Sequence, residues 1–302
     1  MLYRAKLFLH KLLKPFFEVF LKMYFFDRTI EFNILSPKGK LGQYLIYIEP
    51  VLRERRNLSK QNKLIIINPG KVPNSFMESM YKRYVQIYNI SELILGPLVL
   101  KMLYSLEYQK SKMVIPILYG KNLGASTKHL WASKGICKFT EEELIRGGEL
   151  LKEMGLSGKD RFVVLGVREA HYYRDNVDLD ANPEASEEYF GRNPDISNYA
   201  LAVEFLNNKG IKVIKQGFPG GPPCKIDGVI DYANNHRSEF GDIYLHAHAL
   251  FTISGCCGNF HISDVFNVPI ILTDSYDVQN RPVREGSLYI SQKYFDSKQK
   301  RY

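Results

Sequence analysis

The sequence is short of cysteine and of long apolar runs, and each shortage excludes a class of protein. Its 302 residues include four cysteines, too few for a disulfide-stapled scaffold, and none forms a C-x-x-C pair typical of zinc sites. No apolar run approaches 18 residues and the mean hydropathy is −0.23, which excludes a polytopic membrane protein. Internal repeats and low-complexity segments are also missing. We expect a globular protein of a reducing, cytoplasmic compartment.

The net charge of +9 (41 basic minus 32 acidic residues) gathers at the two ends of the chain. Residues 1–32 hold six Lys or Arg against three Asp or Glu, and residues 293–302 hold four against one. The long body between them is nearly balanced. Since no nucleic-acid-binding motif accompanies the charge, we do not expect nucleic acid as a partner.

Residues 1–32 are expected to form a basic amphipathic helix. Steps of three, four and seven residues place one stripe of mostly basic side chains on a single face: Arg4, Lys11, Lys14, Glu18 and Lys22. Charges interrupt the apolar residues too often for a secretory signal peptide. Two interpretations stay open. Either the helix lies in the headgroup region of an anionic membrane, at the inner face of the plasma membrane, or it packs its apolar face on the domain behind it.

The chain length predicts two domains, which we expect at residues 33–130 and 131–302. A buried strand is expected at 64–67, after a helix at 43–56. Thr140 and Glu143 form a capping box at the start of a helix that ends near 154. The second half alternates strands at 162–167, 211–215, 229–230, 250–254 and 268–272 with helices at 196–208, 238–249 and 260–266. This alternation predicts an α/β fold with a doubly wound parallel sheet.

Ligands of such sheets bind at the carboxyl ends of the strands, so the loops there hold the candidate residues. Arg168, Glu169 and His171 follow the strand at 162–167. An arginine at this place is able to fork onto a phosphate or carboxylate, or to pair with an acid at the surface.

The loop after the strand at 250–254 is built of small residues. It consists of Ser254, Gly255, Cys256, Cys257, Gly258 and Asn259 and leads into a helix. Small side chains let a ligand approach the backbone, where amide groups bind anions. No base stands near either cysteine in the sequence, so we interpret both as packing residues rather than nucleophiles.

Three further features are weaker candidates. Gly217 begins a glycine- and proline-rich loop that either bends around a base or sugar or only connects two strands. Arg237 and Ser238 precede a helix, with Ser238 as the expected N-cap and Arg237 as a nucleotide contact or a solvated side chain. The D-x-D pair at 178–180 has no strand before it and His246 and His248 face different ways on a helix, so no metal site is expected.

The segment 162–274 carries a family resemblance. Its "FVVLGVREAHYY", "RNPDISNYALAVEFLNNKGIKVIKQG" and "HRSEFGDIYLHAHALFTISGCCGNFHISDVFNVPIILTD" resemble a family of bacterial glycosyltransferases from surface-polysaccharide gene clusters, distantly similar to fucosyltransferase-type GT-B enzymes. "KGKLGQYLIYIEPVLRERR" and "LIIINPGKVPNS" look like the first domain of that family. The resemblance covers about residues 33–290. It departs from the family at Gln43, where many members have histidine, and at Cys256 and Cys257, where serine or threonine is usual.

The resemblance implies two Rossmann-like domains that face a cleft, a GT-B-like arrangement. It also implies a nucleotide-sugar donor on the C-terminal domain and a glycan or lipid-linked acceptor on the N-terminal one. Arg168 matches the arginine that such enzymes keep for the donor diphosphate. We therefore expect a metal-independent glycosyltransferase of polysaccharide biosynthesis with no cofactor besides its donor, and Glu169 and His171 are the nearest candidate bases. Pyruvyl or other group transfer on the same fold, and a nucleotide- or glycan-binding protein without catalysis, are the alternatives.

Overall fold

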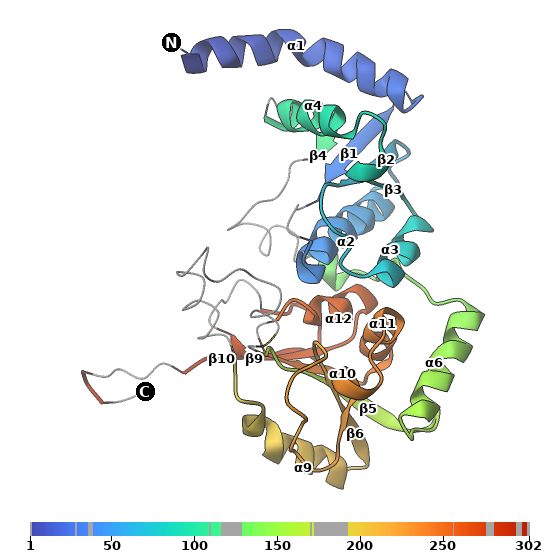
Figure 1. Cartoon of the computed structure of the whole chain (residues 1–302), viewed down its shortest axis with the longest axis vertical. Helices are drawn as coiled ribbons and strands as arrows, with labels where there is room; N and C mark the ends of the chain where they lie inside the picture. The colour runs from blue at the N-terminus through green and yellow to red at the C-terminus, as the bar shows by residue number, and fades with distance from the viewer. Residues whose placement is uncertain are drawn as a thin grey trace. The chain divides into compact units, whose positions relative to one another are not determined.

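A computed structural model describes residues 2–27, 29–35, 39–108, 110–115, 129–169, 171, 193–255, 257–275, 281–293 and 298–300. The chain divides into two compact units, 1–123 and 124–302. Each unit contains one parallel β-sheet with helices around it (Figure 1). The predicted α/β class with parallel sheets is therefore confirmed.

The first unit holds a four-stranded parallel sheet in the order β3-β2-β1-β4. Its strands are β1 Ile30–Ile34, β2 Lys63–Asn68, β3 Gln86–Asn89 and β4 Val114–Ile115. Its helices are α1 Leu2–Tyr24, α2 Leu41–Asn57, α3 Ser75–Lys82, the short 3₁₀ helix η1 Ile90–Glu92 and α4 Gly96–Tyr108. Helix α1 runs unbroken through Pro15.

The second unit holds a six-stranded parallel sheet in the order β10-β9-β8-β5-β6-β7. Its strands are β5 Arg161–Gly166, β6 Ile211–Gln216, β7 Val229–Asp231, β8 Thr252–Ser254, β9 Ile270–Ser275 and β10 Leu288–Ser291. Its helices are α6 Glu141–Glu153, the 3₁₀ helix η2 Ile196–Tyr199, α9 Ala200–Asn208, α10 Tyr232–Asn235, α11 Glu239–His248 and α12 Phe260–Phe266.

Both sheets have the strand order of doubly wound α/β folds. Counted from the first strand of each unit, the first sheet reads 3-2-1-4 and the second reads 6-5-4-1-2-3. In such sheets the chain winds outward from the middle in both directions, and the order reverses between strands one and four. In the second unit this reversal falls between β5 and β8. The side chains of Val163 and Leu165, on β5, lie in the buried core.

Local sequence signals place most of these elements. The capping box at Thr140 is confirmed, because Thr140 Oγ1 accepts from the Glu143 amide and Glu143 Oε2 accepts from the Thr140 amide, at 3.3 and 2.8 Å. The strand expected at 268–272 is β9, and a further strand that the sequence did not predict, β10, follows it. Pro97 stands in the first turn of α4, where a helix tolerates proline.

Helix α6 packs on α11 through a glycine, which gives a test of this interface. A Cβ atom at Gly147 would lie 1.9 Å from the Tyr244 ring, whereas one at Gly148 would have nothing within 4 Å. We expect Gly147→Ala to lower the free energy of unfolding by about 1–3 kcal/mol, because the added methyl overpacks the interface. The neighbouring Gly148→Ala should raise it by about 0.5–1 kcal/mol, because alanine favours helix. Denaturant unfolding of both variants measures the difference, and equal effects would contradict the packing.

Candidate functional site

The candidate site lies at the carboxyl ends of β5 and β8, where the strand order reverses. The last residues of these strands, Gly166 and Ser254, pair with each other. Arg168 follows β5 by two residues and is buried, although arginine is rarely buried without a specific role. Since doubly wound sheets bind ligands in the crevice at this reversal, the geometry places Arg168 at the position where a ligand's charge is expected.

The turn after β8 is held together by its own polar groups. The Gly255 amide donates to the Gly166 carbonyl at 3.0 Å, and the Cys257 amide donates to the Gly255 carbonyl at 2.7 Å. The Ser254 hydroxyl donates to the Gly255 carbonyl at 2.8 Å, and the Cys257 thiol donates to Asn259 Oδ1 at 2.6 Å. The amides of Gly255 and Cys257 thus already have acceptors, on β5 and within the turn respectively. Cys256 lies outside the described residues.

In the described part of the chain the amides of Gly258 and Asn259 donate to no backbone carbonyl. Backbone amides of this kind are able to bind an anion. The Asn259 side chain lies against the end of β5, because a Cβ atom at Gly166 would stand 3.1 Å from Asn259 Nδ2. A glycine at the last position of β5 therefore lets the turn approach the strand closely.

A third strand end contributes residues that the sequence did not reveal. The Tyr199 hydroxyl lies 2.7 Å from Thr273 Oγ1 and donates to Asp274 Oδ2 at 3.2 Å. Thr273 Oγ1 in turn donates to the Ser254 carbonyl at 3.3 Å. Asp274 has a left-handed backbone, with φ of +48°. Burial raises the pKa of Tyr199, and the nearby Asp274 carboxylate adds to this, so the phenol stays protonated. These bonds tie η2 to the carboxyl ends of β8 and β9.

Glu169 lies in a buried charged cluster with two residues from other strands. Lys215 Nζ, near the end of β6, lies 3.0 Å from Glu169 Oε1 and 3.7 Å from Asp231 Oδ1 at the end of β7. Lys215 is 1% exposed. Burial alone would raise the pKa of Asp231, but the Cys224 amide, the Asn234 side chain and the Lys215 charge together hold it below its usual value. The cluster therefore contains an ionised Asp231 beside the ammonium group.

The loop after β6 encloses both candidate bases. A Cβ atom at Gly217 would lie 2.8 Å from Glu169 Oε2, and one at Gly221 would lie 2.4 Å from the His171 ring. His171 Nε2 donates to the Phe218 carbonyl at 3.1 Å, so in the neutral ring Nδ1 is the acceptor nitrogen. Glu169 Oε2 and His171 Nδ1 are buried, and the described residues give neither a hydrogen-bond donor. Both basic atoms are shielded from solvent in this structure.

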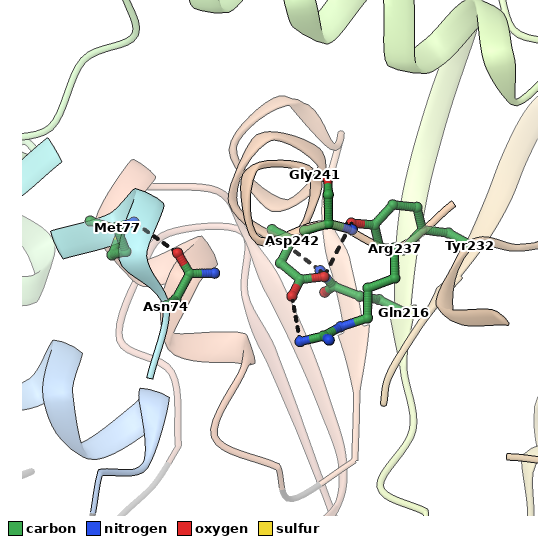
Figure 2. Close-up of polar contacts among 8 residues, drawn as sticks. Asn74, Met77, Gln216, Tyr232, Arg237, Gly241 and Asp242 are labelled. Carbon is green, nitrogen blue, oxygen red and sulfur yellow. Dashed lines mark hydrogen bonds and ion pairs between the residues drawn. The ribbon is translucent and has the colours of Figure 1, made fainter. Parts of the chain in front are cut away.

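Arg237 and Ser238 belong to a polar cluster at the start of α11, and Figure 2 shows Arg237, Gly241 and Asp242 of this cluster. Arg237 Nη2 lies 3.0 Å from Asp242 Oδ2, and its guanidinium lies 5.3 Å from the centre of the Phe218 ring. Ser238 Oγ accepts from the Gly241 amide at 3.0 Å, which confirms it as the N-cap.

Gln216 and Tyr232 donate to the same Asp242 carboxylate, each at 3.2 Å (Figure 2). Burial raises the pKa of Asp242 despite these partners and the Arg237 charge. The polar groups of Arg237 and Ser238 thus serve the start of this helix, and their contact with a nucleotide remains a prediction.

The expected lack of a metal site concerns His246, His248 and the D-x-D pair at 178–180. Residues 178–180 lie outside the described residues. His246 is buried, its Nδ1 lies 2.9 Å from Ser263 Oγ and 3.2 Å from Thr252 Oγ1, and burial lowers its pKa to about 3. It is a neutral core residue. Among the described residues, no three His, Cys, Asp or Glu side chains are grouped so that they could hold a metal ion.

No protein-family model matches the chain, and no curated protein sequence matches it. Several solved structures are similar in part. Escherichia coli ADP-heptose LPS heptosyltransferase II is 11% identical, with 86% of this chain and 90% of that chain covered and a TM-score of 0.49. E. coli heptosyltransferase WaaC with ADP is 12% identical, with 86% and 93% covered and a TM-score of 0.48.

A glycosyl transferase family 9 protein from Veillonella parvula is also 12% identical, with 83% of this chain and 68% of that chain covered and a TM-score of 0.38. None of these three is a fucosyltransferase, so the expected likeness to that type is not shown. At such identities and TM-scores a likeness assigns no function, which has to come from the residues at the strand ends.

Proposed function

We propose that the protein is a glycosyltransferase that moves a sugar from a nucleoside diphosphate sugar to a glycan or lipid-linked acceptor in bacterial surface polysaccharide biosynthesis. One observation carries this proposal. A buried arginine and a turn of small residues stand together at the strand-order reversal of a parallel sheet with the doubly wound order. A diphosphate needs positive charge and backbone amides in a place of this kind.

In the proposed reaction, Arg168 stabilises the negative charge that grows on the leaving diphosphate. The amides of Gly258 and Asn259 add hydrogen bonds to it. Because a fixed positive charge and fixed dipoles do this work, the proposed enzyme needs no metal ion, and a chelator should leave turnover unchanged. The acceptor hydroxyl loses its proton to a base. Glu169 or His171 would fill that role only after the loop at 217–221 moves away from them.

A second candidate function is nucleotide or glycan binding without transfer. The observation in its favour is the enclosure of both candidate bases, since Glu169 Oε2 and His171 Nδ1 are buried. The two functions share the donor site and differ only in turnover, so a binding experiment and a product experiment separate them.

We expect one nucleoside diphosphate among ADP, UDP, GDP and CDP to raise the melting temperature of the full chain. At a hundred times its Kd, a ligand adds about 2.7 kcal/mol of stability, which corresponds to roughly 5–10 °C for a unit of this size. The matching nucleoside, which lacks phosphate, is the control and should give a far smaller shift. If none of the four nucleoside diphosphates raises the melting temperature, the proposed donor site is wrong.

The sugar nucleotide of the stabilising base then decides between the two functions. Release of the free nucleoside diphosphate in the presence of a bacterial glycan or glycolipid acceptor supports transfer. Stabilisation without release at any acceptor supports the binding protein. Phosphoenolpyruvate in the same thermal screen tests pyruvyl transfer, for which it would be the stabilising donor.

A further inference from the structure

Helix α1 is attached to the first unit by one face. Leu21 and Phe25 are buried, and the Phe25 ring lies 5.3 Å from the Phe32 ring of β1, edge to face. The Ser111 hydroxyl donates to Glu18 Oε1 at 2.5 Å. Helix α1 also lies beside α4 (Figure 1). These contacts fix the rotation of α1 about its axis, so they also decide which face remains outside.

The outer face of α1 is a continuous apolar stripe of large side chains. Leu12, Phe16, Val19, Met23 and Phe26 are 56, 67, 56, 69 and 96% exposed. The spacing of four, three and four residues keeps Leu12, Phe16, Val19 and Met23 on one side of α1. Phe26 follows two residues beyond the end of the helix. Monomeric soluble proteins rarely leave a contiguous apolar patch of this size to water. Packing on the domain behind it therefore accounts for only one face of the helix. The apolar stripe on the outer face requires a binding partner of its own.

The charge beside the stripe identifies the kind of occupant. Residues 2–24 contain five cations (Arg4, Lys6, Lys11, Lys14 and Lys22) and one anion (Glu18), a net charge of 5 − 1 = +4. Lys11 and Lys22 each stand one residue before a member of the stripe, so they follow the same edge of it. Glu18, the one acid, already accepts a hydrogen bond from Ser111.

We propose that this face of α1 lies in the headgroup region of an anionic lipid bilayer, parallel to its surface. The apolar stripe would enter the boundary of the acyl chains while the cations meet lipid phosphates. A second copy of the helix fits less well. Two such helices would bring +4 against +4, and Glu18, the one acid of the helix, already accepts a hydrogen bond from Ser111. The described helices include none that is long and apolar enough to cross a membrane.

Sedimentation of the full chain with lipid vesicles tests the proposal without any assay of sugar transfer. We expect the chain to bind vesicles of phosphatidylcholine that contain about 30% phosphatidylglycerol, which supplies the anionic surface. It should bind little to vesicles of phosphatidylcholine alone, and high salt should weaken its binding to the anionic vesicles. Phe16→Ser should reduce the partition coefficient about tenfold, since a large apolar side chain no longer enters the bilayer. Lys11→Gln should reduce it about fivefold.

Phe205→Ser is the matched control. Phe205 lies on α9 of the second unit, is 62% exposed and has a lysine ammonium 5.8 Å from its ring centre, so the same substitution removes a similar exposed ring elsewhere. It should leave vesicle binding unchanged. The proposal is overturned if the chain does not bind anionic vesicles, or if Phe16→Ser binds them as well as the wild type and Phe205→Ser do. It is also overturned if light scattering shows a dimer that Phe16→Ser dissociates.

Discussion

Replacing Lys215 by methionine is expected to lower the free energy of unfolding by about 3–5 kcal/mol, because two largely enclosed carboxylates lose the buried cation between them. Lys215 Nζ lies 3.0 Å from Glu169 and 3.7 Å from Asp231, and its side chain is almost wholly enclosed. Methionine matches the length of lysine, so the volume is kept while the charge is removed. Trp131, the only tryptophan, is buried in the second unit and reports its unfolding in denaturant by fluorescence.

Lys212→Met is the control for this loss. Lys212 stands three residues earlier on the same strand and is exposed, so the same substitution should change stability by no more than about 0.5 kcal/mol. Adding Glu169→Gln to Lys215→Met should restore part of the loss, because one unpaired charge is then neutralised. Equal stabilities for the two lysine variants would show that the buried cluster contributes nothing.

Elements of the second sheet could be predicted because their signals are local. A parallel strand is buried on both faces and therefore reads as a short apolar run, as at 162–167 and 211–215. Helix α12 has the bounds that the sequence predicted. Strand β10, Leu288–Ser291, was not predicted from the sequence. It lies at the edge of the sheet with mostly exposed side chains, so it has no buried apolar run that would mark it as a strand.

The candidate site could be predicted in position but only in part in composition. Arg168 and the turn at 254–259 follow directly from where two strands end. Lys215 and the Tyr199 to Asp274 bond join segments that lie 46 and 75 residues apart in the chain, and no local pattern announces such pairs. One signal for Lys215 was present. It is a lysine that directly follows two buried aliphatic residues within a predicted parallel strand, a position with no access to solvent.

Tertiary contacts also change the expected roles of two residues that the sequence singled out. Gly217 is not only a breaker, because any side chain there would meet Glu169. Arg237 is not simply solvated, because its guanidinium forms an ion pair with Asp242 and lies over the Phe218 ring. These contacts limit the directions from which a ligand can reach it. In both cases the sequence identified the residue, and the partners were found only in the folded chain.

Arg168→Ala is expected to lower the turnover of the donor sugar nucleotide about 10²–10³-fold, the usual effect of removing one group that stabilises developing negative charge. The guanidinium is a fork that binds two phosphate oxygens at once. Arg168→Lys keeps the charge without the fork and should retain an intermediate rate. The measurement is the rate of nucleoside diphosphate release with the donor that stabilises the wild type.

Arg161→Ala is the control, because Arg161 is the exposed first residue of the same strand, β5, at the end opposite to the candidate site. Its rate should equal that of the wild type. A melting temperature without ligand separates a catalytic loss from unfolding, and if alanine at 168 unfolds the unit, the lysine variant still carries the test. A folded Arg168 variant with undiminished turnover would remove the arginine from the donor site, because its charge would then act on something other than the leaving diphosphate.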